Sequence, residues 1–161
     1  MIRKAKFGDI MAMVELLEGM RAKSIYTDRA ELSRDAVKTL FASAIQRDGH
    51  RNAGGSLVLV VEGEGGKLCG MLIGVLERAY YVLDKLMATD LFFFTTEDAT
   101  PSDAITMARQ FKGWAKSNPL VIEITMGATH VMGDWKPATA IYRRLGLEQS
   151  GVIYSMKVVT Q

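Results

Sequence analysis

Apolar residues recur along the chain with two different spacings, which predict helices and strands. Spacings of three and four residues predict an amphipathic helix after Asp9 and another after Ser33, because Asp and Ser are common N-terminal helix caps. Helical patterns also cover 104–116 and 136–146, and Gly146 suits the left-handed position that follows a helix. Apolar runs that favour β-structure predict strands at 2–5, 57–62, 68–77, 87–95, 120–126 and 151–159.

The order of these elements, β α α β β β α β α β, predicts one α/β domain that spans residues 1–161. A chain of this length suits a single domain with its own hydrophobic core. The segment 63–67 is rich in glycine and joins two predicted strands, which favours a hairpin. We therefore expect a mixed, mostly antiparallel central sheet flanked by about four helices.

Composition and charge argue against several classes of function. Lys and Arg number 20 against 18 for Asp and Glu, so the net charge of +2 makes no strong case for nucleic acid or an anionic membrane as a partner. No apolar run is long enough to span a bilayer, and the start of the chain lacks the apolar region of a secretory signal. We expect a soluble, cytoplasmic protein. Its single cysteine, Cys69, excludes an internal disulfide, and no metal-ligand spacing is present.

The segment between the strand-like run 91-LFFF-94 and the helix at 104–116 joins a strand to a helix N-terminus. Such a junction commonly holds a phosphate, because free N–H groups and the helix dipole face it. This one has no glycine, however, and carries three acidic residues, Glu97, Asp98 and Asp103.

Two interpretations of this junction are open. In the first, 100-TPSD-103 is a capping box in which Thr100 is the N-cap and Asp103 reaches back to the Thr100 amide. Such a cap stabilises a helix by about 1 kcal/mol and needs no ligand. In the second, Ser102 is the N-cap and its hydroxyl donates to a phosphate oxygen in place of a glycine amide.

The element order and the segment 140-AIYRRLGLEQSGVIYSMKV-158 together resemble the GNAT superfamily of N-acyltransferases. In that family the last helix commonly reads A-x-x-x-Y-x-x-x-G-F, and a Gly-Val-x-Tyr strand follows. Ala138, Tyr142 and Gly146 take these places here, and Leu147 stands where Phe is usual. The sequence similarity is concentrated in the C-terminal third, while the element order matches nearly the whole chain. The resemblance implies a single GNAT-like domain.

The resemblance also implies acetyl-coenzyme A as co-substrate and no metal. The family motif Q/R-x-x-G-x-G/A wraps the coenzyme pyrophosphate with backbone amides, and without gaps it falls on 99–104, where only Ala104 matches. Side-chain substitutions leave the backbone N–H groups in place, so we still expect these groups to bind the pyrophosphate. The residues that the resemblance implies as cofactor contacts are Phe93, Phe94, Thr95, Ala99, Thr100, Ser102, Asp103, Ala104 and Ile105.

Acyl transfer needs stabilisation of the tetrahedral oxyanion and a proton for the departing thiolate. The resemblance implies the backbone N–H groups of 92–94 for the first and Tyr142, as general acid, for the second. From spacing alone, Tyr142 also fits the rim of an amphipathic helix with a hydrated hydroxyl. Asp90 is a candidate general base, with Glu123 as an alternative.

The acceptor side in this family is built by the first two helices with their joint, here about 20–33, and by the loop before Trp135, so Tyr26 and Trp135 offer aromatic walls. The predicted function is an acetyl-coenzyme A-dependent N-acetyltransferase that acts on an amine of a small molecule or a protein. The alternative is a catalytically silent GNAT-like module that serves as a protein-binding or regulatory domain, which the missing glycines and the acidic loop favour. Relatives often pair, so a homodimer is a further expectation.

Overall fold

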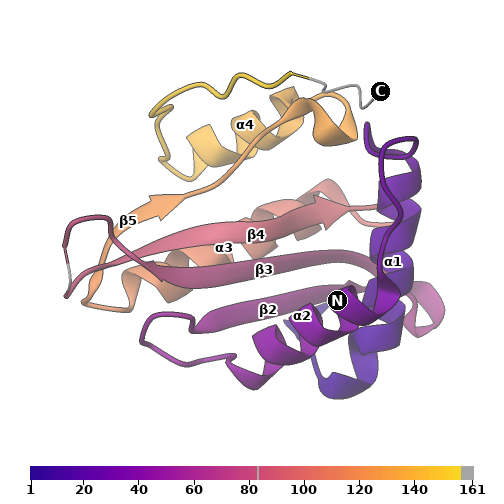
Figure 1. Cartoon of the computed structure of the whole chain (residues 1–161), viewed down its shortest axis with the longest axis horizontal. Coiled ribbons are helices and arrows are strands. Elements are labelled where there is room, and N and C mark those ends of the chain that lie inside the picture. Colours follow the sequence, from indigo (N-terminus) through magenta and orange to yellow (C-terminus); the bar gives the residue numbers. More distant parts are fainter. Residues whose placement is uncertain (83, 157–161) are drawn as a thin grey trace.

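The computed structural model describes residues 1–82 and 84–156, and its elements follow the predicted order up to the last helix (Figure 1). Three single-turn 3-10 helices lie among them. The principal elements are β1 (Ile2–Lys4), α1 (Ile10–Ala22), α2 (Arg34–Gln46), β2 (Ser56–Glu62), β3 (Leu68–Arg78), β4 (Leu86–Thr95), α3 (Pro101–Lys116), β5 (Val121–Thr125) and α4 (Lys136–Arg144).

The strands of the described residues form one five-stranded sheet in the order β1-β2-β3-β4-β5. Pairing is antiparallel from β1 to β4 and parallel between β4 and β5. Helices α1 and α2 cover one face, α3 covers the other, and α4 lies at the β5 end of the sheet (Figure 1). The predicted mixed, mostly antiparallel α/β fold is confirmed. No helix within the described ranges has the length and apolar composition needed to cross a membrane.

Two hydrophobic clusters lie on opposite faces of the sheet. Val58 of β2 joins α1 and α2 in the first, whereas its neighbour Leu57 joins α3 in the second. Both faces are covered, which explains why β2 and β3 are apolar at nearly every position rather than at alternate ones. On the α3 side the approach is close, because a Cβ atom built on Gly74 would lie 2.3 Å from the Phe111 ring.

The helix ends follow local sequence in three cases. The Ser33 hydroxyl accepts from the Ala36 amide at the start of α2. Gly146 has a φ of 78° after α4, and the Gly146 and Leu147 amides donate to the carbonyls of Arg143 and Tyr142. This pattern is the Schellman motif, so the predicted end of α4 is confirmed. The third case, at α3, belongs to the candidate site.

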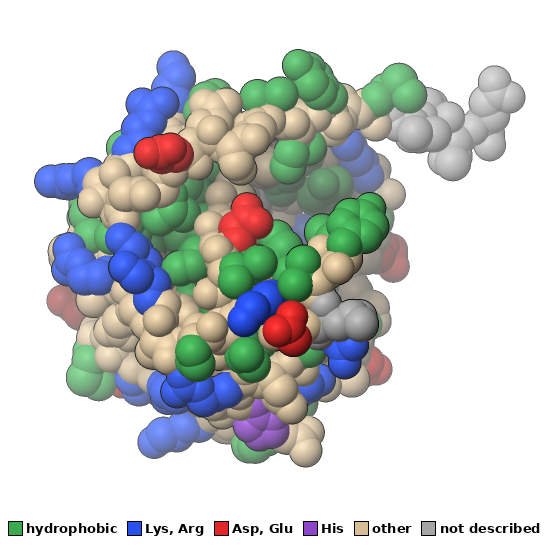
Figure 2. Space-filling view, turned by 90° about the vertical axis from the view of Figure 1, so that its left-hand side faces the viewer, with side chains coloured by type: hydrophobic (Ala, Val, Ile, Leu, Met, Phe, Trp, Pro, Cys, Tyr) green, Lys and Arg blue, Asp and Glu red, His purple; other side chains and the backbone are tan. Residues whose placement is uncertain are grey.

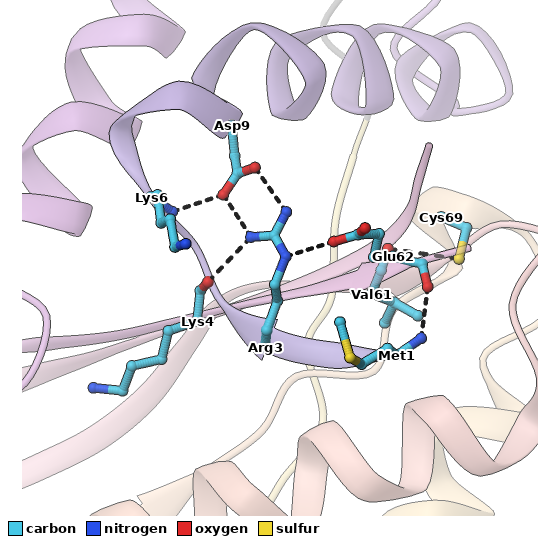
Figure 3. A network of polar contacts seen from close by, with 8 residues as sticks. All are labelled: Met1, Arg3, Lys4, Lys6, Asp9, Val61, Glu62 and Cys69. Carbon is cyan, nitrogen blue, oxygen red and sulfur yellow. Dashed lines mark hydrogen bonds and ion pairs between the residues drawn. The ribbon is translucent and has the colours of Figure 1, made fainter. Parts of the chain in front are cut away.

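The predicted N-cap position of Asp9 at α1 is confirmed, but its side chain makes no bond to the first turn of that helix. Asp9 stands at the N-cap position, but its carboxylate accepts instead from the Lys6 amide at 2.7 Å and from both terminal nitrogens of Arg3, at 2.7 and 2.9 Å (Figure 3). The Arg3 Nε donates to Glu62 at 2.6 Å. A paired guanidinium binds a carboxylate more strongly than a single helix amide does. The group therefore ties β1 to the start of α1 and the end of β2.

The predicted last strand at 151–159 is also wrong over its described part. Residues 151–156 lie outside any helix or strand, and 157–159 fall outside the described residues. The apolar side chains Val152, Ile153, Tyr154 and Met156 are exposed. Figure 1 shows this segment on the side of α4 that faces away from β5. A strand needs a partner edge, and α4 stands between this segment and the edge of the sheet.

Candidate active site

The candidate site begins where β4 and β5 separate, a region called the notch below. The two strands pair from Leu86↔Val121 to Thr89↔Thr125, while β4 continues to Thr95 without β5 beside it (Figure 1). At the same place the register between β3 and β4 shifts, so that Leu91 is an extra residue in β4. Such a bulge bends and twists a strand, which accounts for the divergence.

Residues 92–94 of β4 keep their partners on β3 but have none on the notch side among the described residues. The N–H groups of a strand alternate between its two edges. Only alternate residues of 92–94 therefore present an N–H to the notch. An open strand edge of this kind pairs with an extended ligand through the main chain.

Tyr142 and Asp90 meet at the notch around the backbone of Gly127. The Tyr142 hydroxyl donates to the Gly127 carbonyl at 2.8 Å, and the Gly127 N–H donates to Asp90 Oδ1 at 2.8 Å. The Tyr142 ring lies 6.2 Å from that of Phe93 and the residue is only 7% exposed, so the alternative of a rim residue with a hydrated hydroxyl is wrong. Sequence analysis missed Gly127, because a glycine after a strand carries no sign of its side-chain partners.

Burial governs the ionisation of both side chains. It raises the pKa of the Tyr142 phenol above its ordinary value near 10, and the charge of Asp90 raises it further. Burial also raises the pKa of the Asp90 carboxyl, although hydrogen bonds from the amides of Gly127 and of Asp90 itself oppose the change. Tyr142 therefore keeps its proton at neutral pH. Glu123, the alternative base, is exposed on β5.

The loop from β4 to α3 forms hydrogen bonds within itself. Thr100 is the N-cap, and its N–H and hydroxyl both donate to Asp103 Oδ2, at 2.9 and 2.7 Å. These bonds lower the pKa of Asp103. The Ser102 hydroxyl lies 2.8 Å from that of Thr100. The capping-box interpretation is thus confirmed and Ser102 is not the cap. Ala104 and Ile105 follow in the first turn of α3.

Most amides of this junction are consequently engaged. The Thr96 N–H donates to the Cys69 carbonyl, the Ala99 N–H to the Thr96 carbonyl and the Asp98 N–H to the Thr96 hydroxyl. Pro101, at the first helical position, has no N–H to offer. Most of the backbone N–H groups that could wrap an anion here are therefore already bound within the chain.

Acidic side chains also surround the N-terminus of α3. A surface hollow of about 500 Å³ lies beside it, and Glu62, Glu64, Asp98 and Asp103 are among its lining residues. Lys67 forms an ion pair with Asp98 at 3.4 Å. Carboxylates outnumber cations in this hollow, so the local field opposes a pyrophosphate.

The net charge of +2 conceals an uneven distribution of charge. Basic residues lie along the second half of α3 and at the end of α4, where the Lys112 ammonium donates to the Leu145 carbonyl. Figure 2 views the end of the molecule that carries the turn between β3 and β4, and it shows Lys and Arg side chains spread along one side of that end. Arg143 and Arg144 are exposed. The positive charge on α3 and α4 therefore lies away from the N-terminus of α3.

The predicted acceptor residues lie in two different segments, Tyr26 between α1 and α2 and Trp135 at the start of α4. Tyr26 and Trp135 are each 47% exposed, and Arg29 lies 5.9 Å over the Tyr26 ring. The segment between α1 and α2 that carries Tyr26 contacts both sides of the notch. Lys23 pairs with Glu97 after β4 at 3.2 Å, and the Ile25 N–H donates to the Val131 carbonyl after β5. This segment therefore bridges the loops that follow the two strands.

No family model and no curated protein matches the chain. Solved structures are similar over nearly the whole length. Glucosamine-6-phosphate N-acetyltransferase from Arabidopsis thaliana is 13% identical with a TM-score of 0.69, covering 98% of this chain and 97% of that one. An acetyltransferase from Trypanosoma brucei is 10% identical with a TM-score of 0.69, over 98% and 99%. Aminoglycoside antibiotic 6'-N-acetyltransferase from Acinetobacter haemolyticus is 16% identical with a TM-score of 0.64, over 99% of both chains. The chain has the GNAT fold.

Proposed function

We propose that this protein is an N-acetyltransferase that takes acetyl-coenzyme A into the notch and transfers the acetyl group to an amine. The observation that carries the proposal is the notch itself, an open edge of β4 that leads to a buried tyrosine. The names of the similar structures support acetyl transfer as the class of reaction, since they include enzymes named for an amino sugar phosphate and for aminoglycosides.

The two ends of the cofactor fit this chain differently. The open edge of β4 supports binding of the pantetheine arm, which pairs with the backbone of Phe93, Phe94 and Thr95 like an added strand in this proposal. The pyrophosphate fits poorly at Ala99, Thr100, Ser102 and Asp103, because their amides and hydroxyls are largely engaged and the neighbouring charge is negative. We infer that the strand provides most of the affinity for the cofactor.

The reaction requires a C–N bond to form at the thioester carbonyl and the C–S bond to break. Backbone N–H groups on the notch side of 92–94 stabilise the oxyanion that forms in between. The leaving thiolate takes a proton from Tyr142, whose hydroxyl first gives up its bond to the Gly127 carbonyl. The attacking amine arrives unprotonated and loses its extra proton to solvent, and Tyr142 regains a proton from solvent. Tyr26 and Trp135 flank the acceptor, which is an amine of a small molecule or a protein.

The test pairs binding with turnover. Titration calorimetry with acetyl-coenzyme A should show binding in the micromolar range. Tyr142→Phe should lower turnover about 10–100-fold, measured as thiol release from acetyl-coenzyme A with a panel of primary amines, while the dissociation constant stays the same. Tyr80→Phe is the matched control, because Tyr80 is exposed in the turn between β3 and β4. Equal turnover in the Tyr142→Phe and Tyr80→Phe variants would remove Tyr142 from the mechanism.

A catalytically silent binding module is the second candidate, and one observation favours it. The α3 N-terminus is capped by its own Asp103 and bordered by carboxylates, an arrangement that needs no ligand. On this alternative neither acetyl-coenzyme A nor coenzyme A binds below millimolar concentration. The calorimetric titration therefore separates the two functions before any acceptor is known.

A further inference from the structure

The backbone of Gly127 is held by side chains from two other elements at the point where β4 and β5 part. The last paired residues of the two strands are Thr89 and Thr125. Just beyond them the backbone hydrogen bonds between β4 and β5 stop. The Asp90 side chain accepts from the Gly127 N–H in their place, and Tyr142 of α4 donates to the Gly127 carbonyl. One residue thereby connects β4, the chain after β5, and α4.

We propose that Asp90 is a positioning residue for Tyr142 and acts through Gly127. A hydrogen bond to the Asp90 side chain joins two backbone segments that are farther apart than a direct backbone hydrogen bond allows. Asp90 therefore keeps the chain after β5 attached to β4 without closing the notch. The Gly127 carbonyl is thereby fixed, and it in turn sets the position of the Tyr142 hydroxyl. The consequence for catalysis rests on the proposed function, whereas the geometric role does not.

The contacts of Asp90 also argue against its role as general base. Its carboxylate accepts from the Gly127 N–H, and the residue is only partly exposed. A general base needs an oxygen directed at the acceptor amine. The hydrogen bonds of Asp90 are directed at the protein backbone instead.

Its negative charge has a second effect on Tyr142. Asp90 and Tyr142 both bind Gly127, through its N–H and its carbonyl, and the Phe93 ring lies 6.2 Å from the Tyr142 ring. Burial raises the pKa of Tyr142 and the neighbouring carboxylate of Asp90 raises it further, so the phenol stays protonated in the free chain.

Two measurements on the free chain test the proposal, and neither needs a ligand. The first is amide hydrogen exchange at Gly127, an exposed residue whose N–H is protected by the Asp90 bond. The second is the titration of Tyr142, followed by carbon NMR of labelled tyrosine and assigned by the signal that Tyr142→Phe removes. Asp90→Asn keeps an acceptor oxygen but removes the charge, whereas Asp90→Leu removes both.

We expect Asp90→Leu to speed exchange at Gly127 at least about tenfold and Asp90→Asn to change it by less than about threefold. Asp90→Asn should lower the titration midpoint of Tyr142, and Glu123→Gln, an exposed carboxylate on β5, should not. Unchanged exchange in Asp90→Leu, or an unmoved Tyr142 midpoint in Asp90→Asn, overturns the proposal. An equal shift with Glu123→Gln does so too. If Asp90→Leu fails to fold, Asp90→Asn still decides the case through the Tyr142 midpoint.

Turnover then links the geometry to the proposed function. Asp90→Leu should lower turnover about 10–100-fold, and Asp90→Asn should restore most of it, because the carbonyl that sets Tyr142 remains in place. If the wild-type chain binds no acetyl-coenzyme A, the proposed function fails. The exchange and titration results would still test the positioning role of Asp90, independently of the proposed function.

Discussion

Substitution of Asp103 tests most directly whether the N-terminus of α3 binds an anion. Its carboxylate closes the capping box of α3 and lies where a pyrophosphate would approach the helix. Asp103→Asn removes one negative charge and keeps the shape of the side chain. The variant should bind acetyl-coenzyme A more tightly and fold less stably, two effects of opposite sign from one substitution.

The size of the affinity change follows from Coulomb's law. A carboxylate about 6 Å from a dianionic pyrophosphate costs about 1.4 kcal/mol in the dielectric of water. Screening at physiological salt, with a Debye length of about 8 Å, reduces this to about 0.65 kcal/mol, which corresponds to about threefold tighter binding. The stability should fall by roughly 0.5–1 kcal/mol, because Asn is a weaker partner for the Thr100 amide and the helix dipole.

Calorimetry at low and physiological salt measures the affinity, and urea unfolding measures the stability. Glu77→Gln is the matched control, because it removes the same charge from the far end of β3, and it should leave the dissociation constant unchanged. The gain for Asp103→Asn should be larger at low salt. Unchanged or weaker binding at both salt concentrations, together with the expected loss of stability, would show that the phosphates do not approach α3.

Two predictions concern stability alone. Gly74→Ala should cost about 1–3 kcal/mol in urea unfolding, because the added methyl group meets the Phe111 ring; a cost below about 0.5 kcal/mol would contradict the close packing of α3 on β3. Arg3→Met should cost about 1–2 kcal/mol near neutral pH, since it leaves Asp9 and Glu62 without their guanidinium partner. Arg3 lowers the pKa of Asp9 in the folded state, so the Asp9 contribution is complete above the ordinary value near 4 and disappears as the pH falls through the folded value. Urea unfolding from pH 7 to 2 should show the wild-type advantage shrinking below about pH 4, and a constant difference would argue against the ion pair.

Local sequence was sufficient wherever the interacting residues lie within a few positions of each other. The Ser33 cap, the Thr100–Asp103 capping box and the Gly146 turn were all predictable, because helix caps bond to amides or carbonyls of the adjacent turn. The continuous apolar run of β2 likewise indicated a strand. Asp9 shows the limit of this reasoning, since its carboxylate binds Arg3 and the Lys6 amide rather than the next turn of helix.

Long-range geometry explains the rest of the candidate site. Sequence resemblance indicated Tyr142, but nothing in the chain shows that it shares Gly127 with Asp90, because that meeting depends on the bulge at Leu91 and the parting of β4 from β5. Residues 151–156 also differ from their predicted strand because of long-range geometry, since α4 stands between them and the edge of the sheet.

By itself, then, the amino-acid sequence determined the order of the elements as far as the last helix and several of the helix ends, because helical and strand periodicity and end caps are properties of neighbouring residues. Tertiary packing determined which edges are paired, which amides are engaged and which side chains meet at the notch. These outcomes depend on contacts between residues far apart in the chain, and no local pattern encodes them.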